Sequence, residues 1–264
     1  MLSTFFNMTT VPFSEKCPVS DLMSDERMTE GLARLTFMAQ SESLALITGD
    51  EGVGKSSLIK LFMHSLDKKS FSPVYYHLTT LKPISFLKML VSAMNEIPSP
   101  GKEQAFMQLL SKIKEKDFIT LLIIDEAHLL PPPSLVDLRL LISCATDDID
   151  RLKIVLVGHP DLKKEMKRSC HAALRQRLKV MYHLPPLSKT QTQHYIDFHL
   201  KRCSASLKIF DADVKSAIHD TTRGIPRLIN NVATACLLTA YSKNVKQVSM
   251  EIFSQALDDI QPLL

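Results

Sequence analysis

Residues 49–56 read Gly-Asp-Glu-Gly-Val-Gly-Lys-Ser, which matches in full the phosphate-binding pattern G-x-x-x-x-G-K-[ST]. An apolar run at 44–47 precedes this loop, and a segment rich in helix-forming residues, 57–62, follows it. A strand, a loop and a helix in that order are the setting in which the pattern binds phosphate. Three of the chain's 7 glycines lie within these eight residues. The sequence therefore predicts a P-loop that binds a nucleoside triphosphate.

Each residue type in this loop has a chemical reason. Glycines let consecutive backbone N–H groups converge on phosphate oxygens without a Cβ in the way. A helix that begins near Lys55 adds the positive end of its dipole, and we expect Lys55 to reach the β- and γ-phosphates and Ser56 to ligate Mg²⁺. The alternative is a glycine-rich turn with an exposed lysine. We expect the nucleotide to be held by Gly49, Asp50, Glu51, Gly52, Val53, Gly54, Lys55, Ser56 and Ser57.

A second apolar run ends in two acidic residues. Residues 119–124 read Ile-Thr-Leu-Leu-Ile-Ile, and Asp125 and Glu126 follow. The run predicts a strand buried on both faces, with its carboxylates at the sheet edge where parallel sheets bind ligands. We expect Asp125 to hold Mg²⁺ through water and Glu126 to polarise the attacking water; a solvated strand-end carboxylate is the alternative for Glu126. For His128 we favour packing at a helix start over a catalytic role.

Length and composition limit the class of protein. A chain of 264 residues, 45% hydrophobic and 23% charged, suits one large domain or one domain with a small accessory domain. No apolar run approaches the roughly 18 residues of a membrane span, and the first residues do not resemble a signal peptide. The 5 cysteines have no metal-binding spacing. We therefore expect a cytoplasmic protein with reduced thiols and no membrane association.

The order of the predicted elements indicates an α/β fold. Strand-like runs alternate with helix-like runs, which predicts a parallel sheet covered by helices on both faces. We expect strands at 44–48, 73–78, 119–124, 153–158 and 179–184. We expect helices before and between these strands at 25–40, 55–68, 83–95, 102–115 and 134–146.

Pro185-Pro186 marks a change in this pattern. Beyond it we expect only helices, at 188–203, 211–220, 225–241 and 248–259. The sequence thus predicts three parts, namely an N-terminal arm at 1–24, an α/β nucleotide-binding domain at 25–187 and a small all-helical domain at 188–264. In the arm, Pro12 and Phe13 could fold over the nucleotide base; a disordered leader is the alternative.

Positive charge is concentrated in one segment. The net charge of +4 is modest, but residues 151–179 contain many more basic than acidic residues. A helix over 160–168 would present a basic face opposite Leu162 and Met166. Such a face suits the phosphate backbone of DNA, while a solvated face that maintains solubility is the alternative. The basic residues of this face are Lys163, Lys164, Lys167 and Arg168.

The P-loop, the strand ending in Asp-Glu, an arginine-bearing segment and the helical C-terminal region together resemble an AAA+ ATPase over nearly the whole chain. Within that class the chain resembles the ExeA/GspA-type family. The P-loop and Asp-Glu blocks are general, whereas Gly-Ile-Pro-Arg-Leu-Ile-Asn-Asn at 224–231 is more particular. Further shared blocks are Pro12-Phe13, 45–49, 122–131, 156–158 and 174–178. The resemblance implies a three-layer α/β/α parallel sheet with a helical lid, and ATP with Mg²⁺ as cofactors.

The same resemblance implies roles for further residues. Arg177 matches the position that supplies an arginine finger to a neighbouring subunit, with Arg175 as the reserve candidate, and Arg227 matches the sensor-2 arginine of the lid. Surface salt bridges or DNA contacts are the alternatives. His159 stands where relatives often place Gln or Asn as sensor 1. A neutral imidazole can still position water, so we expect hydrolysis that is slow or pH-dependent.

The chain ends directly after the lid, which favours stand-alone relatives over secretion-assembly members that continue into a membrane span. Stand-alone proteins of this size resemble the ATPase partners of DDE-type transposases, similar in role to Mu B, IstB and TnsC. We therefore expect an ATPase that assembles on double-stranded DNA as a ring or helical filament and delivers target DNA to a DDE-type transposase. Its hydrolysis would be slow and stimulated by assembly or DNA.

Two other functions stay open. One is a secretion or envelope-assembly ATPase with a membrane partner, and the other is a nucleotide-gated adaptor with little hydrolysis. The sequence does not determine the subunit count, the choice between ring and filament, the partner, the surface that meets DNA, or the hydrolysis rate with histidine at position 159.

Overall fold

A computed structural model describes residues 2–14, 17–77, 83–145 and 151–260. The chain divides into two compact units, and each is described by itself. The sheet unit comprises residues 27–50 and 55–184. The helical unit comprises residues 1–26, 51–54 and 185–264.

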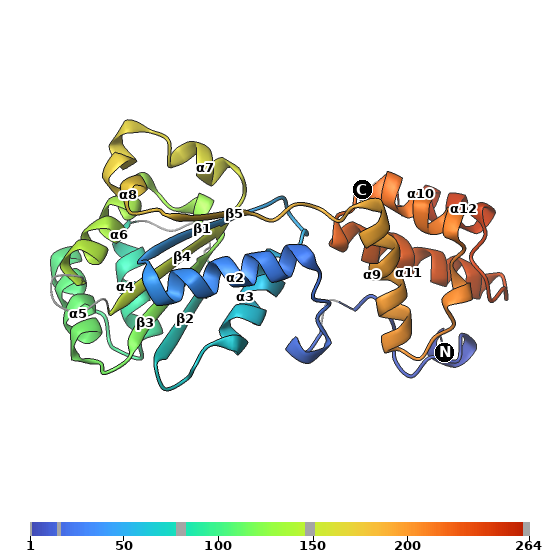
Figure 1. The fold of residues 1–264 in the computed structure, drawn as a ribbon, viewed down its shortest axis with the longest axis horizontal. Helices are drawn as coiled ribbons and strands as arrows, with labels where there is room; N and C mark the ends of the chain where they lie inside the picture. Colours follow the sequence, from blue (N-terminus) through green and yellow to red (C-terminus); the bar gives the residue numbers. More distant parts are fainter. Residues whose placement is uncertain (1, 15–16, 78–82, 146–150, 261–264) are drawn as a thin grey trace. The chain divides into compact units, whose positions relative to one another are not determined.

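The sheet unit is built on five parallel strands in the order β2-β3-β4-β1-β5. Their core positions are rich in β-branched and leucine side chains, which suit a sheet buried on both faces. The predicted parallel α/β sheet is confirmed (Figure 1); position 78, predicted to end the second strand, lies outside the described residues. The strands are β1 (Leu44–Thr48), β2 (Phe71–His77), β3 (Ile119–Asp125), β4 (Leu152–Gly158) and β5 (Val180–His183).

The register of this sheet brings the C-terminal ends of its strands to one edge. Thr48 pairs with Gly158 across β1 and β4, and His77 pairs with Asp125 across β2 and β3. Because all neighbours are parallel, residues that follow β1, β3 and β4 leave the sheet on the same side. This edge is therefore where the P-loop and the acidic pair come together.

Helices cover both faces of the sheet, which confirms the three-layer arrangement (Figure 1). Alternate strand residues point to opposite faces, so that Leu44 and Leu46 pack with the helices of one side. That side carries α4 (Pro83–Ala93), α5 (Lys102–Glu115) and α6 (Pro132–Ala145), and the other side carries α2 (Glu26–Ser41) and α3 (Lys55–Ser65). The helix predicted at 134–146 begins at Pro132, because proline is well accommodated in a first helical turn.

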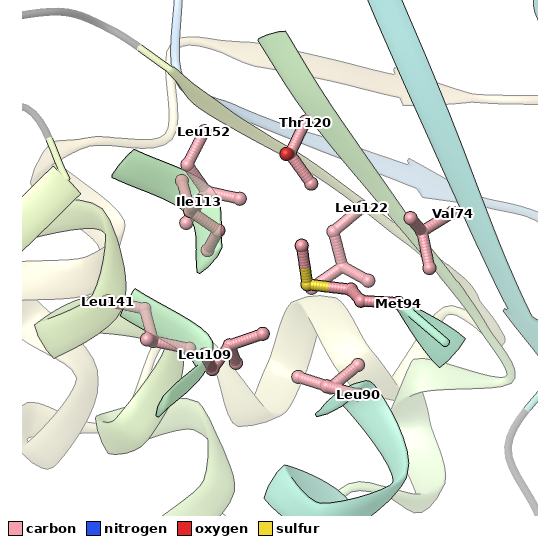
Figure 2. A pocket seen from close by; sticks show the side chains of 9 residues that line it. All are labelled: Val74, Leu90, Met94, Leu109, Ile113, Thr120, Leu122, Leu141 and Leu152. Atoms are coloured by element: carbon pink, nitrogen blue, oxygen red, sulfur yellow. The ribbon is translucent and has the colours of Figure 1, made fainter. Parts of the chain in front are cut away.

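A small apolar pocket lies inside this core, between the sheet and the helices of the α4 side. Figure 2 shows aliphatic side chains and one methionine around it, together with the hydroxyl of Thr120 from β3. Thr120 is 2% exposed, and its Oγ1 has no hydrogen-bond partner among the described residues. The pocket is lined by Val74, Leu90, Met94, Leu109, Ile113, Thr120, Leu122, Leu141 and Leu152.

The helical unit contains the predicted C-terminal helices. Ser188 begins the first of them as a capping box, in which its hydroxyl accepts from the Gln191 N–H and the Gln191 side chain accepts from the Ser188 N–H. The helices surround an apolar core of their own, which also contains Phe6, Met8 and Phe13 of the N-terminal segment. The elements are α1 (Leu2–Phe5), η1 (Val19–Asp21), α9 (Lys189–Arg202), η4 (Leu207–Ile209), α10 (Ala212–Thr222), α11 (Pro226–Ser242) and α12 (Met250–Ile260).

The sequence predicts a chain without a membrane span and with reduced cysteine thiols. Within the described ranges, no helix combines the length and the apolar character that a bilayer span requires. All five cysteines are free thiols, and the two in the helical core, Cys203 and Cys236, are buried. Burial raises the pKa of the Cys236 thiol to about 12, so this thiol stays protonated and unreactive at neutral pH.

Candidate nucleotide-binding site

The P-loop connects β1 to α3 at the carboxyl edge of the sheet. Gly52 and Gly54 have φ angles of +76° and +107°, which residues with a Cβ rarely adopt. α3 begins at Lys55, so the first N–H groups of this helix have no intrahelical acceptor and face the loop. This is the strand–loop–helix geometry that the sequence predicts for a phosphate site.

Lys55 is the buried cation of this loop. Its side chain is 7% exposed, and its ammonium donates to the carbonyl oxygens of Gly49 at 2.8 Å and Asp50 at 2.9 Å. The loop's own carbonyl groups therefore hold the ammonium where the pattern requires a phosphate ligand. An ammonium held at this position is suited to phosphate oxygens.

The remaining loop residues differ in exposure. Asp50 and Glu51 are exposed, whereas Val53 is fully buried and Ser57 is half-buried at the start of α3. Gly52 belongs to the helical unit, where its carbonyl accepts from the Arg227 N–H at 3.2 Å. A Cβ on Gly52 would lie 2.7 Å from the Arg227 Cβ, so this close approach also requires glycine.

Asp125, the last residue of β3, is 1% exposed and accepts three hydrogen bonds. Its Oδ1 accepts from the Glu126 N–H at 2.9 Å. Its Oδ2 accepts from the Ser56 hydroxyl at 3.2 Å and from the Tyr75 hydroxyl at 2.6 Å. Sequence reasoning paired Ser56 with Asp125, and the structure brings them together. Sequence reasoning missed Tyr75, because nothing in the sequence shows which group the hydroxyl of a tyrosine in an edge strand contacts.

The residues at this point fit a magnesium ion. A serine hydroxyl and a carboxylate in contact are oxygen ligands, which Mg²⁺ prefers, and Mg²⁺ commonly takes only one or two protein ligands beside phosphates and water. Burial, and then the neighbouring Asp125 carboxylate, raises the pKa of Tyr75 well above its usual range. Tyr75 therefore stays protonated and donates to the carboxylate at any physiological pH.

Glu126 directly follows the strand and has left-handed backbone angles, φ 55° and ψ 33°. A residue with a Cβ adopts this conformation at a cost of about 1 kcal/mol or more, so the surrounding structure must impose it. The turn continues into η2 (Ala127–Leu129), and the Glu126 side chain is about one-third exposed. Its Oε2 lies 3.3 Å from Nδ1 of His128. The carboxylate is thus accessible to water, as its predicted role requires.

His159 follows β4 at the same edge. Its Nδ1 lies 2.9 Å from Asp161 Oδ2 at the start of α7 (Asp161–Glu165), and its backbone N–H donates to His128 Nδ1 at 3.4 Å. Lys164, and to a smaller extent His159, lowers the pKa of Asp161. The predicted sensor-1 residue therefore lies beside the strand end that carries Glu126, with its side chain held by Asp161.

The two finger candidates lie on either side of the end of α8 (Ala172–Gln176) and differ in their contacts. The Arg175 guanidinium donates to the carbonyl oxygens of Met166 at 3.0 Å and Lys167 at 2.9 Å, so it ties α8 to the turn that follows α7. Arg177 is exposed and donates to the Ser143 hydroxyl at 3.0 Å. A guanidinium acting in trans must be free to leave its contacts, which favours Arg177 over Arg175.

Comparisons with known proteins agree with this geometry. Residues 38–166 match the AAA domain family. The chain is 28% identical over 257 residues to general secretion pathway protein A of Aeromonas hydrophila, covering 94% of this chain and 46% of that protein. It thus spans about half the length of this relative. The AAA domain and this identity together support an AAA+ ATPase of the ExeA/GspA type.

Solved structures support the same fold for this AAA+ ATPase. Cdc6p of Pyrobaculum aerophilum superposes with a TM-score of 0.75 at 18% identity, covering 94% of this chain and 70% of that one. The Aeropyrum pernix ORC1 protein, solved in complex with DNA, superposes with a TM-score of 0.69 at 16% identity, covering 92% and 67%. These likenesses show that the chain has the fold of these proteins.

The arm residues of the AAA+ ATPase lie in the helical unit. Pro12 and Phe13 are buried, and the Phe13 ring lies 5.3 Å from the His199 ring and 6.2 Å from the Phe210 ring. Phe13 is therefore a core residue of that unit. Its predicted role as a cover of the base stays a prediction, and so does that of Pro12. Arg227, the predicted sensor-2 residue, is exposed in the first turn of α11.

The basic segment is a shorter helix than predicted. α7 ends at Glu165, and a turn continues to Arg168, because the chain then enters η3 (Ser169–His171). Leu162 and Met166 are nevertheless buried and the four basic side chains exposed, as the predicted face requires. Lys164 pairs with Asp161 at 2.7 Å, and Arg168 pairs with Glu165 at 3.0 Å. Within the described part of the chain, Lys163 and Lys167 have no acidic partner.

Proposed function

We propose that this AAA+ ATPase assembles on double-stranded DNA in an ATP-dependent manner and delivers target DNA to a DDE-type transposase. The observation that carries the DNA-binding part is the set of exposed basic side chains at 163–168, two of which have no acidic partner in the described chain. The transposase is supported by the sequence resemblance to transposition ATPases. The solved DNA complex of the structurally similar ORC1 protein agrees with a DNA-binding role.

Each site residue then has a role in hydrolysis. Lys55 and the loop N–H groups bind the phosphates. Ser56 and Asp125 would hold Mg²⁺, which would supply positive charge to neutralise the phosphates, and Glu126 polarises the attacking water. Arg177, with Arg175 in reserve, completes the site of a neighbouring subunit, so hydrolysis is slow until the protein assembles. The residues with supporting roles are His159 as sensor 1 and Arg227 as sensor 2.

The charge arrangement supports contact with the DNA backbone and not with particular bases. An exposed ammonium that is unpaired can replace counterions on phosphate groups, and each such contact makes affinity fall with salt. Lys164 and Arg168 are each already paired with a carboxylate, so they contribute less to DNA binding. We therefore assign the larger part of binding at this segment to Lys163 and Lys167.

The test is fluorescence anisotropy of a labelled random-sequence duplex, titrated with protein plus ATP, ADP or no nucleotide at two salt concentrations. We expect binding with ATP, weaker binding with ADP, and a steep loss with salt. The double variant Lys163→Ala/Lys167→Ala should weaken binding about tenfold and reduce the salt slope by about 2. Absence of binding with every nucleotide would contradict the proposal.

A matched control distinguishes a local contact from a change in net charge. Lys68 and Lys69 are exposed in the same unit, after α3, and the variant Lys68→Ala/Lys69→Ala removes the same charge. We expect it to bind DNA nearly as the wild type does. Equal losses in both double variants would show that binding follows overall charge and does not use the 163–168 segment.

The relative from the general secretion pathway favours a second candidate function, an ATPase that serves envelope or secretion assembly. This function requires a membrane partner and no DNA. ATP hydrolysis that is unchanged by DNA, together with ATP-dependent association with a membrane fraction, would favour it over the first.

A further inference from the structure

Nδ1 of His128 lies between two partners at the carboxyl edge of the sheet. It is 3.3 Å from Oε2 of Glu126 and 3.4 Å from the backbone nitrogen of His159. Both distances are within or close to hydrogen-bond range, and both involve the same nitrogen atom. One residue thus connects the end of β3, which carries the predicted catalytic carboxylate, to the end of β4, which carries the predicted sensor.

The two partners require opposite states of that nitrogen. The Glu126 carboxylate has only acceptor oxygens, so it requires a proton on Nδ1. The His159 N–H is a donor, so it requires a lone pair on Nδ1. A single imidazole nitrogen satisfies one of them at a time. Which partner is bound therefore depends on whether the proton is on Nδ1, as in the imidazolium or one neutral tautomer, or on Nε2 alone.

The backbone around His128 is built to hold this arrangement. Gly158, the last residue of β4, has no Cβ, and a Cβ there would lie 3.2 Å from both the backbone nitrogen and Nδ1 of His128. That distance is tighter than ordinary van der Waals contact, so a larger residue would push the imidazole away. Glu126 takes left-handed backbone angles directly before η2, and this turn brings its side chain to the same nitrogen. Both features are local and have a cost in backbone freedom.

The elements β4 and α7 pack against η2, which carries His128. Glu126 faces the imidazole from its own turn, and the His159 ring lies 6.0 Å away, centre to centre. Asp161 contacts the His159 side chain, and it is also paired with Lys164. Because the His159 side chain is engaged by Asp161, only its backbone N–H is directed at His128.

We propose that His128 is a positioning residue for Glu126, and that the proton on its Nδ1 determines whether the carboxylate is held or released. With Nδ1 protonated, it donates to Oε2 and leaves Oε1 to orient the attacking water. With Nδ1 unprotonated, it accepts from the His159 N–H, and Glu126 loses its fixed position. This inference rests on the ATP hydrolysis in the proposed function and on neither DNA binding nor the transposase.

Three substitutions of His128 separate positioning from packing. His128→Asn places an amide near the Nδ1 position, which can donate to Glu126 without titrating. His128→Gln places its amide nearer the Nε2 position, and His128→Phe keeps a ring without hydrogen bonds. We expect Phe to lower kcat for ATP about tenfold with KM within about twofold, Gln to resemble Phe, and Asn to stay within about threefold of the wild type.

The matched control is His194→Asn, which changes an exposed histidine of α9 and should leave both kcat and KM unchanged. A Phe variant with wild-type kcat, or an Asn variant as slow as the Phe variant, would overturn the proposal.

A measurement without turnover keeps the inference testable if hydrolysis is weak. In protein labelled with ¹⁵N-histidine, the Nδ1 resonance of His128 should shift in the variant Glu126→Ala, because alanine has no side-chain oxygen to accept from Nδ1. An unchanged resonance would overturn the inference. If wild type and Glu126→Gln hydrolyse ATP at the same rate, the proposed function loses its hydrolytic step, and the NMR result still decides whether His128 holds Glu126.

Discussion

The carboxyl edge of the sheet and the two apolar cores differ in how their buried polar atoms are bonded. At the edge, the ammonium of Lys55 and the carboxylate of Asp125 are almost fully buried, and both are hydrogen-bonded. In the cores, Oγ1 of Thr120 and Nδ1 of His199 are buried without a hydrogen-bond partner in the described chain. The hydrogen-bonded polar groups at the edge form a site that can bind a ligand. Buried polar groups without a hydrogen-bond partner reduce the stability of the fold.

His199 gives the largest expected effect in this comparison. Burial, and then the nearby Arg202, lowers the pKa of its imidazole from 6.5 to about 4. The unfolded chain therefore binds a proton before the folded one does as the pH falls. The contribution of neutral His199 to the free energy of unfolding is complete above pH 6.5. This contribution falls by about 3 kcal/mol as the pH decreases from 6.5 to 4. Urea unfolding at pH values between 7.5 and 4.5, followed by circular dichroism, measures this loss.

The variant His199→Phe assigns that acid sensitivity to one residue. Phenylalanine keeps an aromatic ring beside Phe13 and Tyr195 and does not titrate. We expect its unfolding free energy to depend on pH less steeply than that of the wild type, and the control His194→Gln to follow the wild type. A slope that is unchanged in His199→Phe would mean that other groups cause the acid sensitivity.

Lys55 tests the carboxyl edge of the sheet, where the buried polar groups are hydrogen-bonded. Its replacement gives the second largest expected effect. Lys55→Met keeps most of the side-chain length and removes the charge, so the loop loses its ammonium but little of its packing. We expect ATP affinity to fall about 100-fold, or about 2.7 kcal/mol, in a titration with a fluorescent ATP analogue. Lys60→Met, on the exposed face of α3, is the control. Equal affinities of Lys55→Met and wild type would show that the loop does not bind phosphate through this side chain.

Tyr75 tests whether a neighbour of Asp125 affects metal binding. Tyr75→Phe removes the hydroxyl that donates to Oδ2 at 2.6 Å and leaves the ring in place. Groups that orient a metal ligand typically contribute tenfold or more to metal affinity, so we expect Mn²⁺ affinity in the presence of ATP to fall about tenfold. Electron paramagnetic resonance of free Mn²⁺ measures it, with Tyr76→Phe as the control. Tighter Mn²⁺ binding in Tyr75→Phe would mean that the hydroxyl competes with the ion.

The fold was largely predictable because its signals are local and periodic. The strand at 44–48 was predicted with its observed bounds, since an apolar run before a glycine-rich loop has few other interpretations. The helix predicted at 160–168 is shorter, because α7 ends at Glu165, and amphipathic spacing does not show where a helix stops. Element type followed from sequence pattern, whereas element ends depend on tertiary contacts.

The site was predictable to a smaller extent. Lys55, Ser56 and Asp125 belong to spaced motifs, and the sheet brings them together as the motifs require. The contacts of Tyr75 and His128 depend on strand register and on one left-handed turn at Glu126, which no spacing in the sequence reports. The same limit applies to Phe13, whose burial in the helical core follows from packing over a separation of nearly 200 residues along the chain.

Thr120 gives the smallest expected effect and tests the apolar core, where a buried polar atom has no hydrogen-bond partner among the described residues. Its hydroxyl faces the aliphatic pocket in Figure 2, and a buried hydroxyl without a partner destabilises a fold by about 1 kcal/mol or more. Thr120→Val replaces the hydroxyl with a methyl group of similar size. We therefore expect the unfolding free energy to rise by about 1 kcal/mol, and Thr120→Ser, which keeps the hydroxyl and loses the methyl group, to lower it. ATP affinity should stay unchanged in both variants, because the pocket is separate from the P-loop edge. A loss of stability in Thr120→Val would show that the hydroxyl is bonded in solution, through a water molecule in the pocket, and that this core follows the same rule as the edge.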